Sequence, residues 1–114
     1  MLEDPVKVNE KEFYIFLGNQ LKDRIRVRFD KDKGIILDLI IQYETQVNGK
    51  WTAIVRYDCA HGFFHRDLLH PNGDKDKKAI EVPDLNYAFN FARQDLEDKW
   101  ECYKEQYIKK NKND

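Results

Sequence analysis

The strongest constraint on the fold is a stripe of apolar side chains near the C-terminus. They recur at three- and four-residue spacing for more than five helical turns, the period of an amphipathic helix packed on one surface. The stripe consists of Leu85, Ala88, Phe89, Ala92, Leu96, Trp100, Tyr103 and Tyr107. Pro83 and Asp84 precede it, and Asp84 is the expected N-cap. We therefore expect one long helix over residues 84–110, with the aromatic stripe packed in the core.

Upstream of this helix, apolar residues alternate with polar ones. Charged and apolar side chains alternate strictly from Arg24 to Phe29, as in a strand with one buried and one exposed face. A turn at Lys31–Gly34 leads to a longer strand from Ile35 to about Gln46. Further strands are expected at residues 13–17, 63–69 and 79–82, after a loose lead-in over residues 1–10. With residues 11–82 mostly in strands, the sequence predicts an α+β fold, an antiparallel β-meander of five to six strands with one long C-terminal helix packed across one face.

The register of the next hairpin depends on Asn48-Gly49, a dipeptide that usually forms a two-residue turn. In that register Ile41 would face the charged side chain of Arg56. A three-residue loop, in which Val47 joins the turn, instead pairs Ile41 with Val55. It also pairs Leu39 with Tyr57. Because a shift of one residue moves every side chain to the other face, we expect the three-residue loop.

This register also groups polar residues on the face away from the apolar pairs. It places Arg28 beside Asp38, Asp38 beside Asp58, and Arg26 and Arg56 on either side of Ile40. One interpretation is a solvated sheet face with cross-strand ion pairs, each contributing roughly a few tenths of a kcal/mol. The other is an open groove with a carboxylate pair at one end and arginines placed to hold phosphates.

Charge and cysteine content narrow the classes of function. The chain has 114 residues, and its 20 lysines and arginines nearly balance its 21 aspartates and glutamates, so bulk electrostatic binding of nucleic acid is not expected. Cys59 and Cys102 match no metal-binding or redox spacing and are expected as reduced thiols. The N-terminus lacks the features of a signal peptide, and no apolar run reaches membrane-spanning length. We expect one domain over residues 1–114, located in the cytoplasm and without a membrane partner.

The densest group of reactive side chains lies between Tyr57 and Asp67. Histidine can serve as general acid and base because its unperturbed pKa of about 6.5 lies near neutral pH. The pattern predicts that His61 and His65 exchange protons, while Asp58 orients a histidine and Arg66 stabilises a phosphate. The candidate substrate-binding residues are Arg56, Arg26, Arg28 and Asp67. Such a set supports metal-independent cleavage of RNA after activation of a ribose 2′-hydroxyl, and no cofactor is expected.

Two other interpretations of this segment are open. In the first, His65 is buried beside Phe63 with a backbone carbonyl as its partner, and Arg66 and Asp67 pair with the helix. In the second, a metal ion such as zinc or manganese is bound by Asp58, His61, His65 and Asp67. We rank the metal site lower, because a four-residue step between histidines has no fixed meaning around a Gly-Phe-Phe turn. His70 precedes a Pro-Asn-Gly turn and is expected to anchor it.

The residues of this segment resemble a family of short bacterial and archaeal proteins. Its pattern is a valine and an arginine before a Y-D-x-A-H-G-x-x-H-R-D core, followed by H-P-x-G and by D-x-x-x-x-W-x-x-Y. The matching residues are Val55, Arg56, Tyr57, Asp58, Ala60, His61, Gly62, His65, Arg66, Asp67, His70, Pro71, Gly73, Asp95, Trp100 and Tyr103. That family supplies no activity to carry over. More distantly, the chain is similar to the TumE-like toxins of prokaryotic toxin–antitoxin pairs, which implies an RNA-directed toxin with a helix-turn-helix antitoxin as partner.

Two functions are consistent with the sequence. The first is a small cytoplasmic protein that acts on RNA, as a toxin-like endoribonuclease using His61 and His65. The second is a non-enzymatic module that binds a protein partner or another copy of itself as a homodimer. In that case an exposed strand edge, Trp51 at the hairpin end and the aromatic helix would carry the contacts.

Overall fold

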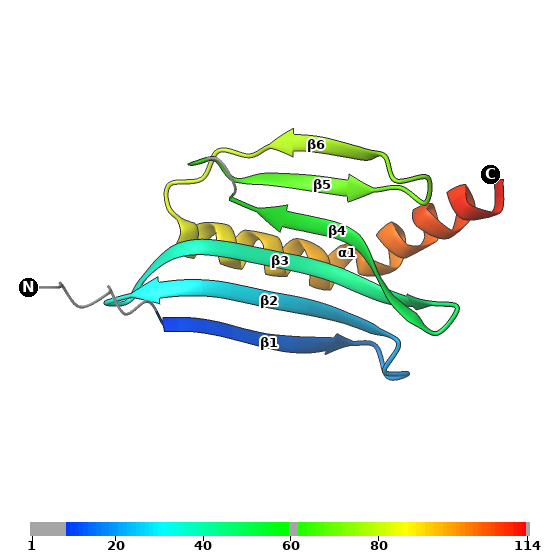
Figure 1. The fold of residues 1–114 in the computed structure, drawn as a ribbon, viewed down its shortest axis with the longest axis horizontal. Coiled ribbons are helices and arrows are strands. Elements are labelled where there is room, and N and C mark those ends of the chain that lie inside the picture. Colours follow the sequence, from blue (N-terminus) through cyan, green and yellow to red (C-terminus); the bar gives the residue numbers. More distant parts are fainter. Residues whose placement is uncertain (1–8, 60–61, 114) are drawn as a thin grey trace, which may run out of the picture.

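The computed structural model describes residues 9–59 and 62–113 of the chain. In these residues six antiparallel strands follow each other in the order β1-β2-β3-β4-β5-β6, and one long helix, α1, comes last (Figure 1). The elements are β1 (Asn9–Leu17), β2 (Asp23–Asp32), β3 (Ile35–Val47), β4 (Lys50–Asp58), β5 (His65–Leu69), β6 (Lys75–Ala79) and α1 (Leu85–Asn113). The predicted α+β meander with one C-terminal helix is confirmed.

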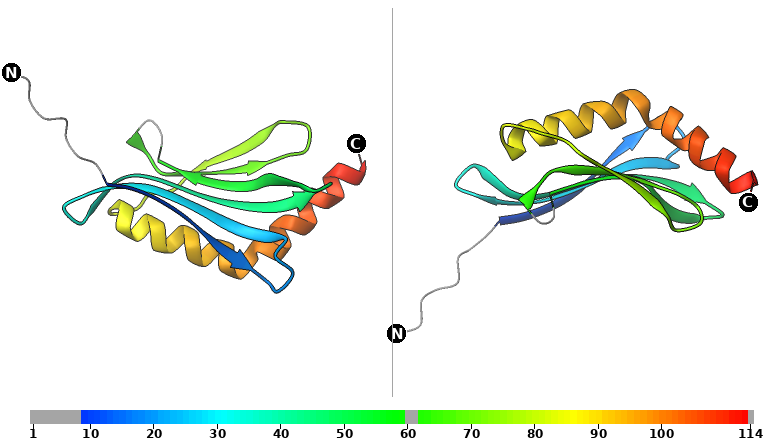
Figure 2. Two further views of the ribbon diagram at one scale, coloured as in Figure 1. Left: turned by 60° about the horizontal axis from the view of Figure 1, so that its bottom comes forward. Right: turned by 90° about the horizontal axis from the view of Figure 1, so that it is seen from above.

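The helix divides the sheet into two different faces. Figure 2 shows α1 lying across one side of the sheet, while the opposite side carries no helix. We call these the helix face and the open face. Because side chains alternate along a strand, the apolar residues of β2 point to the helix face and its arginines point to the open face.

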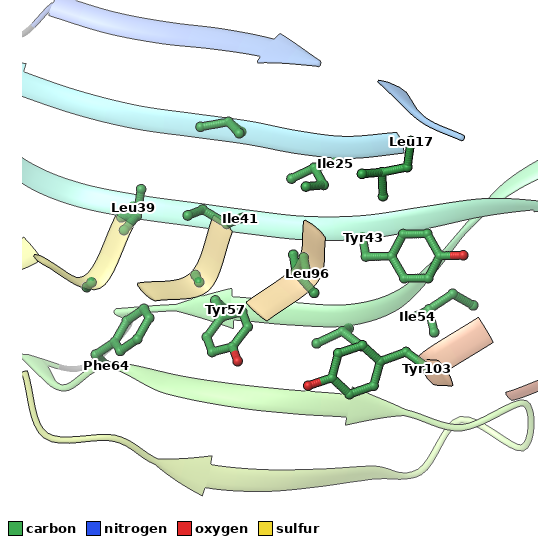
Figure 3. Packing of buried hydrophobic residues seen from close by; sticks show 14 residues of the cluster. Leu17, Ile25, Leu39, Ile41, Tyr43, Ile54, Tyr57, Phe64, Leu96 and Tyr103 are labelled. Atoms are coloured by element: carbon green, nitrogen blue, oxygen red, sulfur yellow. The ribbon is translucent and has the colours of Figure 1, made fainter. Parts of the chain in front are cut away.

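The core fills the space between α1 and the three strands β2 to β4 (Figure 3). Its fully buried side chains include Ile25, Val27, Leu39, Ile41, Tyr43, Val55, Tyr57, Ala88, Ala92 and Leu96. The helical members are those of the apolar stripe, so the prediction that this stripe forms the core is confirmed. Two of them are alanines, which allow the helix to approach the sheet closely. Replacing Leu96 by alanine would cost about 2–5 kcal/mol of folding free energy.

The ends of α1 follow the sequence closely. The carboxylate of Asp84 accepts a hydrogen bond of 2.7 Å from the backbone N–H of Tyr87, so the predicted N-cap is confirmed. The helix ends at Asn113 rather than at residue 110, and Lys109 pairs with Glu105 at 3.2 Å within its last turns.

Within the described residues no helix is long and apolar enough to cross a membrane.

The β3–β4 hairpin corrects the predicted three-residue loop. Val47 pairs with Lys50, and the turn consists of Asn48 and Gly49 alone, both with positive φ. Apolar pairing is kept because Ile54 forms a β-bulge, which lets Tyr43 pair with Val55 and Ile41 with Tyr57. The predicted pairs Ile41–Val55 and Leu39–Tyr57 are therefore wrong by two residues, because the extra residue is Ile54 of β4 and not Val47 of β3.

A second bulge corrects the predicted polar pairs. The register between β2 and β3 shifts after Asp30, and Leu37 is the unpaired residue, 51% exposed. As a result Arg28 pairs with Ile40, so the expected neighbours Arg28 and Asp38 are not paired. Asp38 pairs with Asp30 instead, and Asp58, which was expected beside Asp38, pairs with Ile40. In the next row Arg26 and Arg56 flank Gln42, not Ile40 as expected.

The last strand also lies earlier than predicted. A strand was expected near residues 79–82, but β6 spans Lys75–Ala79 and all five of its residues are exposed. Its register places the lysine-rich segment directly against β5. Hydrophobicity therefore located β2 to β5 but missed β6, which is held mainly by backbone pairing.

Candidate functional site

The open face gathers most of the predicted site residues. The hydroxyl of Tyr57 reaches Asp95 on α1, so Tyr57 and its cross-strand partner Arg66 lie on the helix face. Their neighbours along the strands consequently lie on the open face. The open-face residues are Arg26, Arg28, Arg56, Asp58, His65 and Asp67. Arg66, predicted as catalytic beside His65, is therefore on the opposite side of the sheet, because consecutive residues of a strand alternate in direction.

Three arginines of β2 already have carboxylate partners. Arg24 donates to Glu44 at 2.8 Å. Arg26 and Arg28 donate to the β1 carboxylates of Glu12 and Glu10, at 2.7 and 2.8 Å. The hydrogen bond from Arg26 lowers the pKa of Glu12, so this carboxylate is ionised at neutral pH. A phosphate would have to displace these carboxylates, and the β2 arginines therefore form ion pairs rather than a free binding row.

Behind the arginines lies a buried polar network. Glu44 accepts hydrogen bonds from Arg24 and from the side-chain amide of Gln42 at 2.7 Å, and Gln42 accepts one from Arg56 at 2.9 Å. Glu44 and Gln42 are buried although no helix covers this face. Long side chains shield them. The guanidinium of Arg24 lies 4.2 Å from the Tyr14 ring centre and 3.8 Å from that of Trp51.

His65 and Asp67 lie on the same open face as this network, on the strand next to β6. The two side chains lie 3.5 Å apart at His65 Nε2 and Asp67 Oδ2, and the ring of Phe63 packs 5.3 Å from that of His65. The side chain of His65 is 3% exposed. Among the described residues neither His65 Nδ1 nor Asp67 Oδ1 has a hydrogen-bond partner. Burial of His65 beside Phe63 agrees with the structural interpretation, although the expected backbone partner is not found.

His61 lies outside the described residues, so the predicted acid–base pair of His61 and His65 stays a prediction. A general acid or base needs to come within about 3 Å of the reacting atom. The buried ring of His65 does not offer a nitrogen to a substrate in solvent in this conformation. Asp58 pairs in register with His65, and Arg56 with Asp67. Across residues 9–59 and 62–113 no group of three histidine, cysteine or acidic side chains is placed to hold a metal ion.

A second polar cluster lies on the helix face and was missed by the sequence analysis. The hydroxyls of Tyr57 and Tyr103 point toward each other (Figure 3), and both donate to Asp95 Oδ2, at 2.7 and 2.6 Å. Desolvation and these hydrogen bonds raise the pKa of Tyr103 to about 12 and raise the pKa of Tyr57 further. Arg66 donates to the Tyr103 hydroxyl at 3.4 Å. The available signal was Asp95, an acidic residue beside the apolar helical stripe.

A cleft of about 700 Å³ opens beside the start of α1. Its described lining is mostly apolar and includes Phe63, Ile80 and Leu85. Cys59 lies in its wall and donates to Asp38 at 3.1 Å. Burial, together with this hydrogen bond, raises the pKa of the Cys59 thiol to about 11. The thiol is thus protonated at neutral pH and is a poor nucleophile.

The other exposed feature is the aromatic edge, which we define as Phe13, Tyr14 and Phe16 of β1. Their exposed fractions are 39%, 44% and 49%. Phe13 lies on the helix face and packs edge-on against Phe29, while Tyr14 and Phe16 lie on the open face, with Phe16 edge-on to Trp51. The strand predicted at residues 13–17 is found, but it begins four residues earlier, at Asn9, within the expected loose lead-in over residues 1–10.

A comparison with protein families covers nearly the whole chain. The model of one family matches residues 8–113, from the start of β1 to the end of α1. The chain belongs to the DUF7718 family. DUF7718 is described as a domain of unknown function, so membership assigns no activity. No curated protein and no solved structure matches the chain. The similarity to TumE-like toxins, with its RNA substrate and antitoxin partner, stays a prediction.

Proposed function

We propose that this DUF7718 protein is a non-enzymatic interaction module, and that the edge of β1 pairs with the β1 edge of a second copy. The observation that carries the proposal is an edge strand of nine residues with exposed aromatic side chains on both faces. An edge strand leaves about half of its backbone N–H and C=O groups without a strand partner. Large exposed apolar side chains beside such groups favour addition of another strand.

The turn after β1 supports the same surface. Leu21 is 66% exposed and has a positive φ of 56°. A leucine in this left-handed region costs about 1 kcal/mol relative to a residue that tolerates it. Exposure of its side chain to water adds a further cost. Both costs are explained if Leu21 contributes to a contact at the end of the aromatic edge.

A second copy fits the edge better than an arbitrary strand because β1 can pair with itself. In a continuous sheet, antiparallel neighbours that share a face must be an even number of residues apart. A two-fold axis through Phe13 pairs all nine residues, with Glu10 opposite Phe16 and Glu12 opposite Tyr14. No like charges are then directly opposed, whereas an axis through Lys11 would oppose two lysines. The formal net charge of −1 leaves little repulsion between copies.

The alternative is the RNA-directed role predicted from the sequence. The two buried atoms without partners, His65 Nδ1 and Asp67 Oδ1, are the observation that favours it. A ribonuclease assay of the wild type beside His61→Ala and His65→Ala tests it. Cleavage that both variants lose while remaining folded would replace the interaction module by an enzyme. Absence of cleavage in the wild type is the result that we expect.

Sedimentation velocity over a wide range of concentrations tests the interaction module. We expect the wild type to form a reversible dimer. Phe16→Glu should weaken it at least about tenfold, because symmetry then places the new carboxylate directly opposite Glu10 twice in each dimer. Glutamate at this position faces Arg24 within its own sheet, so the fold should be retained. Phe16→Lys would place lysine opposite Glu10 and should dimerise more tightly than Phe16→Glu, which tests the register.

The matched control is Ala79→Glu on the opposite edge. Ala79 is exposed and lies on β6, so this change adds the same charge to an edge that is not part of the interface. Its dimerisation should equal that of the wild type. A wild type that stays monomeric at every concentration, or a Phe16→Glu variant that dimerises equally well, would contradict the proposal.

A further inference from the structure

The position of α1 leaves a strip of the helix face only partly covered. The helix packs on β3 and β4 and passes β5 and β6 at their side (Figures 1 and 2). The side chains of β5 and β6 that share the helix face are Arg66, Leu68, Asp76 and Lys78. We call this strip the β5–β6 flank. It lies at the far side of the sheet from the aromatic edge.

Arg66 has no carboxylate partner in the described part of the chain. Its partners there are neutral hydroxyls, that of Tyr57 and, at a long 3.4 Å from Nη1, that of Tyr103. Its Nε is buried and has no partner among the same residues. Four of the other arginines, by contrast, have a glutamate within 3.0 Å: Arg24, Arg26, Arg28 and Arg93. Among the described residues, Arg56 and Arg66 are therefore the arginines without a carboxylate partner. Of these two, Arg66 lies on the flank.

Lys78 lies directly opposite Arg66. The two residues are Cα partners across β5 and β6, and they share the helix face. Like charges at directly opposed positions of a sheet destabilise it. No salt bridge of Lys78 is found among residues 9–59 and 62–113. Within these residues, two neighbouring cations thus remain without an anion on an accessible strip of the sheet.

The nearby carboxylates are already occupied. Asp95 accepts hydrogen bonds from Tyr57 and Tyr103 at one oxygen, and its other oxygen lies 3.4 Å from Lys99 Nζ. Asp76, the acidic residue of the flank, lies 2.8 Å from His70 Nε2. Neither carboxylate is positioned to neutralise both Arg66 and Lys78. An anion that neutralised both cations would therefore come from outside these contacts.

We infer that Arg66 and Lys78 bind a phosphate-type oxyanion. The guanidinium offers a planar pair of N–H donors, and the lysine adds a mobile ammonium group on the same side. The Tyr103 hydroxyl accepts a hydrogen bond from Arg66 and so orients the arginine side chain. This site does not depend on the proposed pairing of β1, because the two surfaces lie at opposite edges.

Isothermal titration with inorganic phosphate against chloride at constant ionic strength tests this site. We expect saturable binding of phosphate by the wild type, about tenfold weaker binding by Lys78→Gln and loss of binding by Arg66→Gln. Lys77→Gln is the matched control, since Lys77 is the neighbouring residue of β6 but lies on the open face opposite Asp67. It should bind phosphate like the wild type. If Arg66→Gln does not fold, the exposed Lys78→Gln still decides the outcome.

The source of the phosphate is distinguished by two further titrations, one with a nucleoside 5′-monophosphate and one with a short single-stranded RNA. A monoester that binds more tightly than free phosphate, with the same loss in Lys78→Gln, would assign a small phosphorylated ligand. RNA binding that depends on Lys78 but not on Lys77 would assign a phosphodiester. Absence of saturable binding in all three titrations, or equal losses in Lys77→Gln and Lys78→Gln, would overturn the inference.

Discussion

The two edges of this sheet are built in opposite ways. The β6 edge has the sequence Lys-Asp-Lys-Lys-Ala, and every one of its side chains is exposed. The β1 edge has charges only in its first half, and its second half runs Phe-Tyr-Ile-Phe-Leu. Lysines on an edge strand discourage pairing with other chains, whereas apolar side chains do not. The β6 edge is therefore protected against association with other chains, whereas the β1 edge is suited to it.

Removal of the protection from β6 gives the largest expected effect. Lys75→Val with Lys77→Val would make the open face of β6 apolar, because both lysines lie on that face. Each copy would then have two edges that pair, so that dimers join into open-ended assemblies. Light scattering should show masses above the dimer. The double variant Lys75→Gln with Lys77→Gln keeps the edge polar and should stay dimeric, and identical behaviour of the two double variants would break the comparison.

Alkaline pH tests the contribution of the buried tyrosines to the stability of the fold. The pKa values of Tyr43, Tyr57 and Tyr103 are raised in the folded protein, chiefly by desolvation. A raised pKa stabilises the fold below the unfolded value of about 10, and this stability is lost as pH rises above it. Each tyrosine should remove at most about 1.4 kcal/mol per pH unit, up to about pH 12 for Tyr103. Urea unfolding at pH 8, 10 and 11 measures this loss, and a constant stability through pH 11 would contradict the buried cluster.

The smallest expected effect concerns the turn at the end of β1. Asparagine tolerates a positive φ, so Leu21→Asn should raise the free energy of unfolding by up to about 1 kcal/mol. The same change should weaken the dimer, because an apolar contact is lost. Lys33→Asn is the control, since Lys33 also has a positive φ but offers no comparable apolar side chain. Tighter dimerisation of Leu21→Asn would show that Leu21 is not part of the contact.

Secondary structure was largely predictable because local patterns determine it. The alternation in β2, the period of α1 and the N-cap at Asp84 each report a local preference. The registers were not predictable in the same way. The bulges at Leu37 and Ile54 insert one residue within a strand, and the sequence does not distinguish an extra residue in a strand from one in a turn.

The arrangement of the candidate site was also only partly predictable from the sequence. Segment 57–67 concentrates reactive residues, but alternation along β5 sends Arg66 to one face and His65 with Asp67 to the other. Residues that are close in sequence therefore became neighbours in space for Asp58, His65 and Asp67, but not for Arg66. The cluster of Tyr57, Tyr103 and Asp95 shows the reverse, since Tyr57 and Tyr103 are 38 and 8 residues from Asp95 in sequence and meet it through the packing of α1 on β4.

Hydrogen exchange at low and high protein concentration tests the central claim most directly. Pairing of two β1 edges would protect the outward backbone N–H groups of β1 as the dimer forms, while those of β6 remain exposed to solvent. We predict slower exchange within residues 9–17 at high concentration and no change within residues 75–79. Concentration-dependent protection of β6 in place of β1, or none at either edge, would contradict the account.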